Sequence, residues 1–360
     1  MQTAPSSSLG LWRAATALAV VVATGGCSST PSSWASGADV ALTGTVATAY
    51  MEMPTISFAL DRIDQRELPL DHTYRHFGSG KGITVYVFDG GILDSHPEVA
   101  GRVRRGFDAF PGEERMCNAH GTAVAGAVAG TTLGVAPEAE LVDVKMVECR
   151  RMRGTIDAIV RGTRWVLADH ARHPEQRAIA NWSFIADTTG SVAALDSAVR
   201  DLRAVGIPVV VSAGNLEMNA CRISPANAPG TIVVGASRVR RGRGGRAGEA
   251  MVDDRAPGTA YGPCIDVFAP GDSVLLPSIG MAHEASTQLW TGTSMAAGYV
   301  SGAVALYLEA HPYATPAAVE EYIHASSAFT VVDAVRSPLA GMLYVGPPGA
   351  TSGRLMLARK

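Results

Sequence analysis

The pattern of apolar and polar residues predicts two buried strands that each end in polar residues. Residues 83–88 form a largely apolar run that ends at Asp89, and residues 208–213 form a second run that ends before Gly214 and Asn215. Such runs are typical of strands buried on both faces of a parallel sheet. Because open α/β sheets place functional side chains beyond the carboxyl ends of their strands, Asp89 and Asn215 are candidates for a site.

The segments between and after these strands have helical spacing. Residues 156–171 and 192–205 carry their apolar side chains at the intervals of an amphipathic helix. A third helix begins at Ser294 and is mainly apolar until Pro312, which stops it. Strands that alternate with helices predict a three-layer α/β/α fold with a mainly parallel central sheet. Ser294 would then lie at a helix amino terminus, where the helix dipole favours developing negative charge.

Three separated motifs carry Asp89, His120 and Ser294, in that order along the chain. They read Val-Phe-Asp-Gly-Gly, Asn-Ala-His-Gly-Thr and Thr-Gly-Thr-Ser-Met-Ala. A serine hydroxyl becomes a nucleophile when a base takes its proton, and a carboxylate fixes the tautomer of that base. Each residue alone has a simpler interpretation: a turn aspartate, a structural histidine, or a serine that caps its helix. Together they predict a catalytic triad that only the tertiary fold can assemble.

With these motifs the chain resembles the subtilases, the subtilisin-like serine proteases, and most closely their proteinase K and aqualysin branch. The order Asp, His, Ser is the subtilisin order, and further matches are His-Pro-Glu-Val-Ala-Gly-Arg at 96–102, Gly-Val-Ala-Pro at 134–137 and Ser-Ala-Gly-Asn at 212–215. The resemblance implies one catalytic domain over residues 58–345, followed by a tail at 346–360. It also implies a serine endopeptidase that forms an acyl-enzyme on Ser294, with the amide of Asn215 stabilising the oxyanion.

By the same resemblance, a peptide substrate would bind as an added strand between two segments of the enzyme. Both segments depart from the subtilase pattern. Ile185 puts a branched side chain where glycine usually leaves room for the first pocket, and Arg150, Arg151 and Arg153 replace the usual small residues. The arginines would either favour acidic substrate side chains or form a solvated loop. The expected substrate-binding residues are Ser183, Phe184, Ile185, Arg153, Gly154, Ser212, Ala213 and Gly214.

The sequence is therefore compatible with two functions. The first is a working endopeptidase with an unusual cleft, whose partners are protein or peptide substrates. The second is a catalytically weak or inactive binding protein of the subtilase fold, with a cleft that Ile185 occludes. The joint presence of Asp89, His120, Ser294 and Asn215 favours the first, because a pure binding scaffold does not need them.

Four of the five cysteines predict disulfides. The residues alone leave three pairings open, and the resemblance to aqualysin-like enzymes implies the pairs Cys117–Cys149 and Cys221–Cys264. Such bridges indicate an oxidising compartment. Cys117-x-x-His120 also has the spacing of half a zinc site, although no second ligand pair at zinc spacing follows.

The amino terminus has the pattern of an export signal over residues 1–27. Arg13 precedes an apolar run at 14–23 that is too short to span a membrane. Gly26-Cys27 and the serines after it resemble a lipoprotein cleavage site, which would anchor the protein by lipid on Cys27 in the periplasm or at the cell surface. An ordinary signal cut near Ala23 would instead give a secreted protein. Residues 28–57 are mainly polar or small and predict a flexible tether.

The remaining expectations concern charge, metals and partners. The net charge of −3 and the pI near 6.3 argue against nucleic-acid binding, so the five arginines within residues 238–246 predict a disordered, solvated loop. The resemblance to proteinase K implies a structural calcium held by the carbonyls of Pro229 and Thr231 and the carboxylate of Asp266. Catalysis should need no cofactor, and the chain is expected to be a monomer.

Overall fold

The computed structural model describes residues 50–346, apart from residues 187–188, 243–249, 281–283 and 332. The chain divides into two units, residues 1–43 and 44–360, and every described residue belongs to the second unit. The expected export signal with Cys27, and the expected tail beyond Gly346, lie outside the described residues. Within the described part of the chain, no helix has the length and apolar character needed to cross a membrane.

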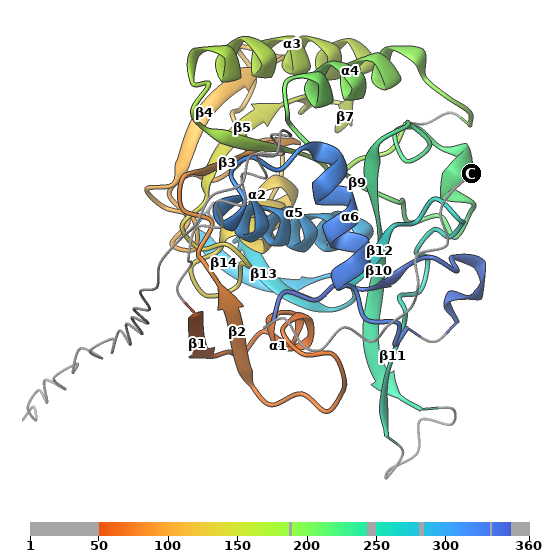
Figure 1. Ribbon diagram of the computed structural model, residues 1–360. Coiled ribbons are helices and arrows are strands. Elements are labelled where there is room, and N and C mark those ends of the chain that lie inside the picture. The colour runs from red at the N-terminus through yellow and green to blue at the C-terminus, as the bar shows by residue number, and fades with distance from the viewer. Residues whose placement is uncertain (1–49, 187–188, 243–249, 281–283, 332, 347–360) are drawn as a thin grey trace, which may run out of the picture. The chain divides into compact units, whose positions relative to one another are not determined.

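The described residues form a central sheet in which all but one of the strand pairings are parallel (Figure 1). The strands are β3 (Ile83–Asp89), β4 (Val103–Asp108), β5 (Glu140–Lys145), β8 (Arg177–Trp182), β9 (Val209–Ser212), β10 (Thr231–Arg241), β11 (Met251–Arg255), β12 (Val267–Pro270) and β15 (Gly341–Met342). Their order is β15-β12-β10-β9-β8-β3-β5-β4, and β11 pairs antiparallel with β10. Both predicted strands are confirmed, because β3 ends at Asp89 and β9 covers 209–212.

Helices cover both faces of this sheet, so the predicted three-layer α/β/α fold is confirmed (Figure 1). One layer contains α3 (Ile156–Arg172) and α4 (Ala193–Ala204), whose ends differ from the expected helices by one residue. The other contains α2 (His120–Ala129) and α5 (Thr293–Ala310), with α6 (Pro316–Ser326) packed on α5. The helix expected to begin at Ser294 therefore begins one residue earlier.

The α5 helix is buried over most of its length and packs closely on α2. All of its residues from Thr293 to Leu306 are buried. A Cβ added to Gly298 would lie 3.0 Å from the carbonyl oxygen of Val124, and a Cβ added to Gly302 would lie 2.8 Å from the carbonyl oxygen of Val128. The two helices can approach this closely only because α5 has glycine at both contacts.

Smaller elements surround the three layers. They are β1 (Tyr50–Pro54), α1 (Phe58–Ile63), β2 (Thr73–Phe77), β6 (Val147–Glu148), β7 (Arg153–Gly154), β13 (Val274–Ile279), β14 (Ala285–Trp290) and the short 3₁₀ helices Ala220–Arg222 and Ala334–Arg336. Three pairs of strands, β1–β2, β6–β7 and β13–β14, are antiparallel. The β6–β7 and β13–β14 hairpins lie close to the candidate site described below.

The expected flexible tether is wrong for residues 50–57. This stretch contains β1, which pairs along its whole length with β2, and the ring of Tyr50 lies 5.0 Å from that of Phe77. The hydroxyl of Ser57 then accepts a hydrogen bond from Leu60 N–H and caps α1. Pairing with β2 supplies the hydrogen bonds and contacts that the composition of this short segment does not reveal. Residues 28–49 lie outside the described residues.

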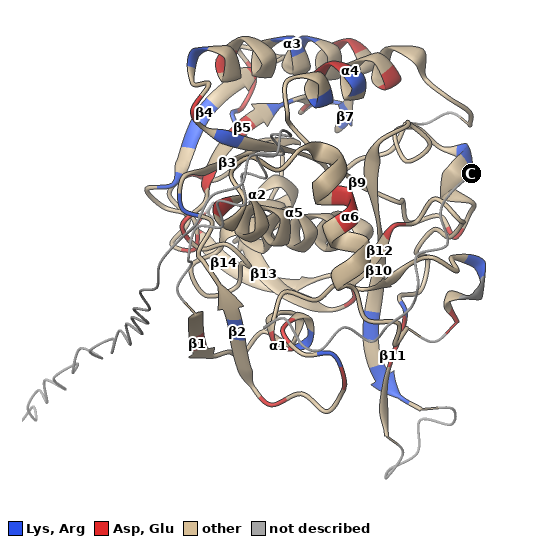
Figure 2. Ribbon diagram, in the orientation of Figure 1, with Lys and Arg blue, Asp and Glu red and all other residues tan. Residues whose placement is uncertain are grey.

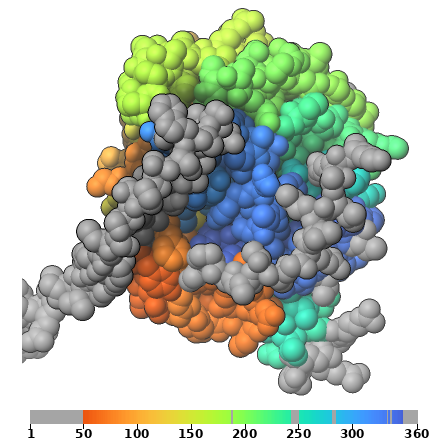
Figure 3. All heavy atoms as spheres, in the orientation of Figure 1, coloured from red at the N-terminus to blue at the C-terminus, as the bar shows by residue number. Residues whose placement is uncertain are grey.

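A buried ion pair joins α1 to the β10–β11 hairpin. Arg62 donates two hydrogen bonds to Asp253, at 2.6 Å and 2.5 Å, and both side chains are fully buried. Val345 N–H donates to the carbonyl of Ile63, so the last described segment of the chain packs on α1, and orange and blue regions adjoin in the space-filling view (Figure 3). Removing either member of the ion pair would leave a buried charge without its partner.

The expected disordered arginine loop is wrong for Arg238–Arg241. These residues belong to β10 and pair with β11, and Arg238 and Arg240 both contact Asp254, at 3.3 Å and 2.5 Å. Basic and acidic residues accordingly face one another along the hairpin (Figure 2). Regular pairing with Met251–Arg255 and this local charge balance explain the difference. Residues 243–249 lie outside the described part of the chain.

We expect Gly302→Ala to destabilise the protein by about 1–3 kcal/mol, the usual cost of overpacking a core. Alanine is favoured over glycine in helices by about 0.5–1 kcal/mol, but the added Cβ would lie 2.6 Å from Val135 Cβ and 2.8 Å from a backbone oxygen. Neither atom is the end of a flexible side chain, so the steric cost exceeds the gain. Urea unfolding measures the difference, with Ala171→Gly on the exposed side of α3 as the control for propensity. A Gly302→Ala protein as stable as wild type would contradict the close packing of α2 and α5.

Candidate active site

The end of β3 and the start of α2 bring Asp89 and His120 together. His120 Nδ1 lies 2.7 Å from Asp89 Oδ2, while Asp89 Oδ1 accepts a hydrogen bond from Gly90 N–H at 2.6 Å. A Cβ added to Gly121 would lie 3.0 Å from Asp89 Cβ, so glycine at this position lets the helix approach the strand. The carboxylate fixes the proton on Nδ1 and leaves Nε2 of the neutral ring as an acceptor.

The surroundings of His120 raise its affinity for a proton. Burial alone would lower the pKa of His120, but the charge of Asp89 and its hydrogen bond outweigh burial, so the pKa lies above the ordinary value of 6.5. A second carboxylate, Asp143, lies on the neighbouring strand β5, and burial raises its pKa to about 7 even though Arg115 Nη2 lies 2.9 Å away. Asp143 therefore titrates near pH 7, and the pKa of His120 lies above its ordinary value.

Contacts between α2 and α5 give Ser294 and His120 equivalent positions at the starts of two packed helices. Gly298 meets the carbonyl of Val124 and Gly302 meets that of Val128, and both pairs are 174 residues apart in the sequence. The two helices therefore run side by side in the same direction, and one turn earlier the same offset joins His120 to Ser294. Among the contacts of the described residues, the Ser294 hydroxyl donates to the carbonyl of Ser183 at 3.3 Å. Hydrogen bonds between nucleophile and base often form only when substrate binds.

Asn215 is held at the start of α5 with its amide oxygen fixed. The oxygen accepts hydrogen bonds from Thr293 N–H at 2.9 Å and from Thr293 Oγ1 at 3.0 Å. The amide nitrogen is left as a donor on the other side, close to Gly292. Backbone N–H groups in the first helical turn, including that of Ser294, have no carbonyl partner within the helix. Thr293, which holds the amide of Asn215, directly precedes Ser294, so both residues lie at the amino-terminal end of α5.

The expected substrate-binding residues lie in two neighbouring loops and one hairpin. Ser183–Ile185 follow β8 and Ser212–Gly214 end and follow β9; the Ser212 hydroxyl donates to the carbonyl of Phe184 at 3.4 Å. Gly214 N–H donates to Thr293 Oγ1 at 3.1 Å, which ties the second loop to α5. The structure thus brings both loops to the start of α5.

A pocket of about 650 Å³ separates the β6–β7 hairpin from the loop after β8. Its apolar lining consists of Met146, Met152, Ile156, Ile159, Phe184, Ile185, Ala186 and Leu195. Arg151 and Glu148 lie at the same pocket and form an ion pair at 3.3 Å, with the Arg151 side chain 76% exposed. Attraction of acidic substrate side chains by the arginines stays a prediction, and the pocket itself suits an apolar side chain.

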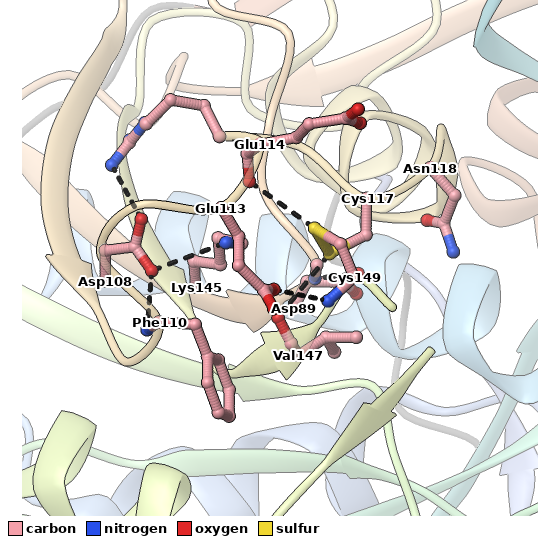
Figure 4. Close-up of a disulfide and its surroundings, with 12 residues drawn as sticks. Asp89, Asp108, Phe110, Glu113, Glu114, Cys117, Asn118, Lys145, Val147 and Cys149 are labelled. Atoms are coloured by element: carbon pink, nitrogen blue, oxygen red, sulfur yellow. Dashed lines mark hydrogen bonds and ion pairs between the residues drawn. A yellow bond between two sulfur atoms is a disulfide. The ribbon is translucent and has the colours of Figure 1, made fainter. Parts of the chain in front are cut away.

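The predicted disulfide pairs are confirmed. Cys117 is bonded to Cys149, and Cys221 to Cys264. The first bridge ties the loop before His120 to the end of β6, and Cys117 N–H also donates to the carbonyl of Gly90 (Figure 4). Because the Cys117 sulfur is bonded to Cys149, the zinc interpretation of Cys117-x-x-His120 is wrong.

Trp290 is a site residue that the sequence motifs did not indicate. Its ring lies edge-on to that of His120, with 6.3 Å between the centroids. The indole N–H donates to the carbonyl of Pro277 at 3.1 Å, across the β13–β14 hairpin. The only sequence signal was an aromatic residue four positions before Ser294, and single aromatic residues are common in ordinary cores. The Trp290 ring therefore lies next to the imidazole of His120 and limits its rotation.

The residues expected to bind calcium have other partners. Asp266 Oδ2 accepts a hydrogen bond from Val233 N–H at 2.7 Å, and Asp266 Oδ1 lies 3.0 Å from His324 Nε2. Neither carboxylate oxygen of Asp266 is therefore without a protein partner, and a calcium ion held with the carbonyls of Pro229 and Thr231 stays a prediction. Nor do three His, Cys, Asp or Glu side chains gather at a possible metal site anywhere in the described segments.

Comparison with known proteins agrees with the motifs and the fold. Residues 80–342 match the subtilase family. An extracellular serine proteinase of Thermus sp. (strain Rt41A) is 40% identical over 273 residues, 75% of this chain and 61% of that protein. Alkaline serine exoprotease A of Vibrio alginolyticus is 34% identical over 289 residues, 80% of this chain and 50% of that protein. The chain thus spans between half and two thirds of the length of these two relatives.

A solved structure shows the same similarity in three dimensions. The crystal structure of a cold adapted subtilisin-like serine proteinase has a TM-score of 0.69 and 32% sequence identity, and the match covers 82% of this chain and 100% of that one. The chain belongs to the subtilase family.

Proposed function

We propose that this protein is a serine endopeptidase in which Asp89, His120 and Ser294 form the triad and Asn215 stabilises the oxyanion. The observation that carries the proposal is the 2.7 Å contact between His120 Nδ1 and Asp89 Oδ2, at the point where α5 runs beside α2. Family membership supports it, since the relatives reported above are named as serine proteinases or proteases.

The geometry suggests a role for each group. His120 Nε2 takes the proton of Ser294 Oγ as the hydroxyl attacks the peptide carbonyl, and Asp89 stabilises the resulting imidazolium. The carbonyl oxygen becomes an oxyanion beside the amide nitrogen of Asn215 and the N–H of Ser294. His120 then returns the proton to the leaving amine, which leaves an acyl-enzyme on Ser294. Water activated by the same histidine releases the acyl group.

The alternative function, a binding protein with an occluded cleft, rests on Ile185. Its side chain lies against Gly214, where the subtilase pattern leaves space. The fixed amide of Asn215 and the held tautomer of His120 favour the enzyme, because binding alone requires neither.

We also propose that the protein is exported. The names of the Thermus protein and of other relatives describe extracellular or cuticle-degrading proteases, and two disulfides suit an oxidising compartment. With a lipoprotein signal, Cys27 would carry a lipid anchor. With an ordinary export signal, Cys27 would be removed or would stay unmodified. Cell fractionation of wild type and Cys27→Ala distinguishes the two kinds of signal. If Cys27 carries a lipid, the wild type is found in the membrane fraction and Cys27→Ala in the soluble fraction; otherwise both are found in the same fraction.

Labelling with a fluorophosphonate probe tests the nucleophile. We expect wild type to be labelled and Ser294→Ala and His120→Ala to be unlabelled, with kcat on peptides lowered on the order of 10⁴-fold or more. Ser326→Ala in α6 and His72→Ala, whose side chain is 86% exposed, are matched controls that should label like wild type. A folded wild type that is not labelled would favour the binding protein.

The pH dependence of kcat/KM tests the role of Asp89. Because catalysis needs neutral His120 and its pKa is raised, we expect the rising limb to have its midpoint above pH 6.5. Asp89→Asn removes the groups that raise the pKa and leaves burial, so the midpoint should move to lower pH while kcat falls on the order of 10⁴-fold. Asp143, with a pKa of about 7, titrates in the same range. Asp143→Asn is therefore the control. If the midpoint of the rising limb shifts more in Asp143→Asn than in Asp89→Asn, the rising limb reports the titration of Asp143.

Chelation tests the calcium that the resemblance implies. Because Asp266 already contacts His324 and Val233 N–H, we expect EGTA to leave the Tm of the wild type unchanged and Asp266→Asn to lower it with or without EGTA. A fall in Tm that added calcium reverses, and that Asp266→Asn does not show, would instead establish a calcium site at Asp266.

A further inference from the structure

The side chain of Ile185 covers Gly214 beside the nucleophile. A Cβ built on Gly214 would lie 3.3 Å from Ile185 Cγ2 and 3.5 Å from Ile185 Cδ1, so the isoleucine rests directly on this glycine. The hydrogen bond from Ser212 Oγ to the carbonyl of Phe184 holds the two loops together at the same place. Gly214 has a φ of 100°, which favours glycine. The gap between the loops is therefore filled by one side chain, that of Ile185.

This gap is where the substrate residue that donates the attacked carbonyl must lie. Ser294 Oγ contacts the carbonyl of Ser183 on one side, and Gly214 N–H is bonded to Thr293 Oγ1 on the other. When the attacked carbonyl points its oxygen at the amide nitrogen of Asn215, its own residue lies across the two loops. Its side chain then meets Ile185 before it can reach Gly214.

We propose that Ile185 is a specificity-determining residue, and that it restricts the residue on the amino side of the scissile bond to glycine, alanine or serine. The inference rests on the proposed endopeptidase function. Small side chains need no cavity between the loops, so Ile185 leaves the reaction intact for them. A leucine or phenylalanine would have to displace Ile185 from Gly214. Ile185 thus selects substrates by size. This role explains why the gap between the two loops is filled although the proposed catalytic residues lie next to it.

A mobile Ile185 side chain would not restrict the size of the substrate residue. Its side chain also borders the 650 Å³ pocket beside the β6–β7 hairpin, and a change of rotamer toward that pocket would open the gap. An enzyme that opened in this way would cleave after bulky residues as readily as after small ones. Wild-type specificity therefore distinguishes a fixed Ile185 from a mobile one.

The test measures kcat/KM on peptides that differ only in the residue before the cut: Gly, Ala, Ser, Val, Leu or Phe. A single methylene group in a pocket changes kcat/KM by about 10–200-fold, so we expect wild type to prefer Ala over Phe on the order of 100-fold. In the series Ile185→Val, Ile185→Ala and Ile185→Gly, the preference should fall stepwise and finally reverse. Val205→Gly also removes a branched side chain, 46% exposed at the end of α4, and should keep the wild-type preference.

Labelling of the same variants with the fluorophosphonate probe distinguishes a failure of the size rule from a failure of the proposed endopeptidase function. Wild type that cleaves well after Leu or Phe, or a series that leaves the preference unchanged, overturns the role of Ile185. Labelled wild type that cleaves none of the peptides also overturns the size rule, but it leaves the activated serine in place. Folded wild type that is not labelled overturns the proposed function, and the size rule with it. A fall in the preference that is already present in Ile185→Val and Ile185→Ala excludes an effect of glycine on loop flexibility alone.

Discussion

The contact between α2 and α5 is the constraint on which the candidate site depends. Gly298 and Gly302 let the backbones of the two helices meet at Val124 and Val128, and this contact sets both the separation and the register of the helices. His120 and Ser294 stand one turn before the first contact. A helix that shifted by one residue against the other would turn its side chains by about 100° and separate His120 from Ser294. Close packing of glycine against backbone therefore sets the positions of these two residues relative to one another.

The parallel sheet supplies the remaining groups at a single edge. β3, β8 and β9 are neighbours in the sheet and run in the same direction, so Asp89, the loop after β8 and the loop before Asn215 all leave the sheet at one side. α5 begins there as well, and Thr293 joins it to Asn215 and Gly214 through three hydrogen bonds. Asp89, Asn215, Ser294 and the loop after β8 thus reach one edge of the sheet from distant parts of the sequence.

Some of this could be predicted from the sequence and some could not, for physical reasons. The apolar runs before Asp89 and Asn215 predicted the strands and their ends, because burial on both faces leaves a clear local signal. The disulfide pairs needed the resemblance, since spacing alone allows three pairings. The strand at residues 50–54 was missed because its stability comes from pairing with β2, a partner the segment itself does not reveal. Trp290 was missed because its role arises from a hairpin folding back onto His120, which no local pattern records.

The register of α2 and α5 has a consequence for how such a protein can change over time. The chain between His120 and Ser294 includes the β6–β7 and β10–β11 hairpins and several loops. The relative position of the two residues is nevertheless set by the contacts between α2 and α5 and not by the length of that chain. Lengthening a surface loop costs little free energy, because closure entropy grows only with the logarithm of loop length. Insertions into surface loops can therefore accumulate and make new contacts while the geometry of the site stays unchanged.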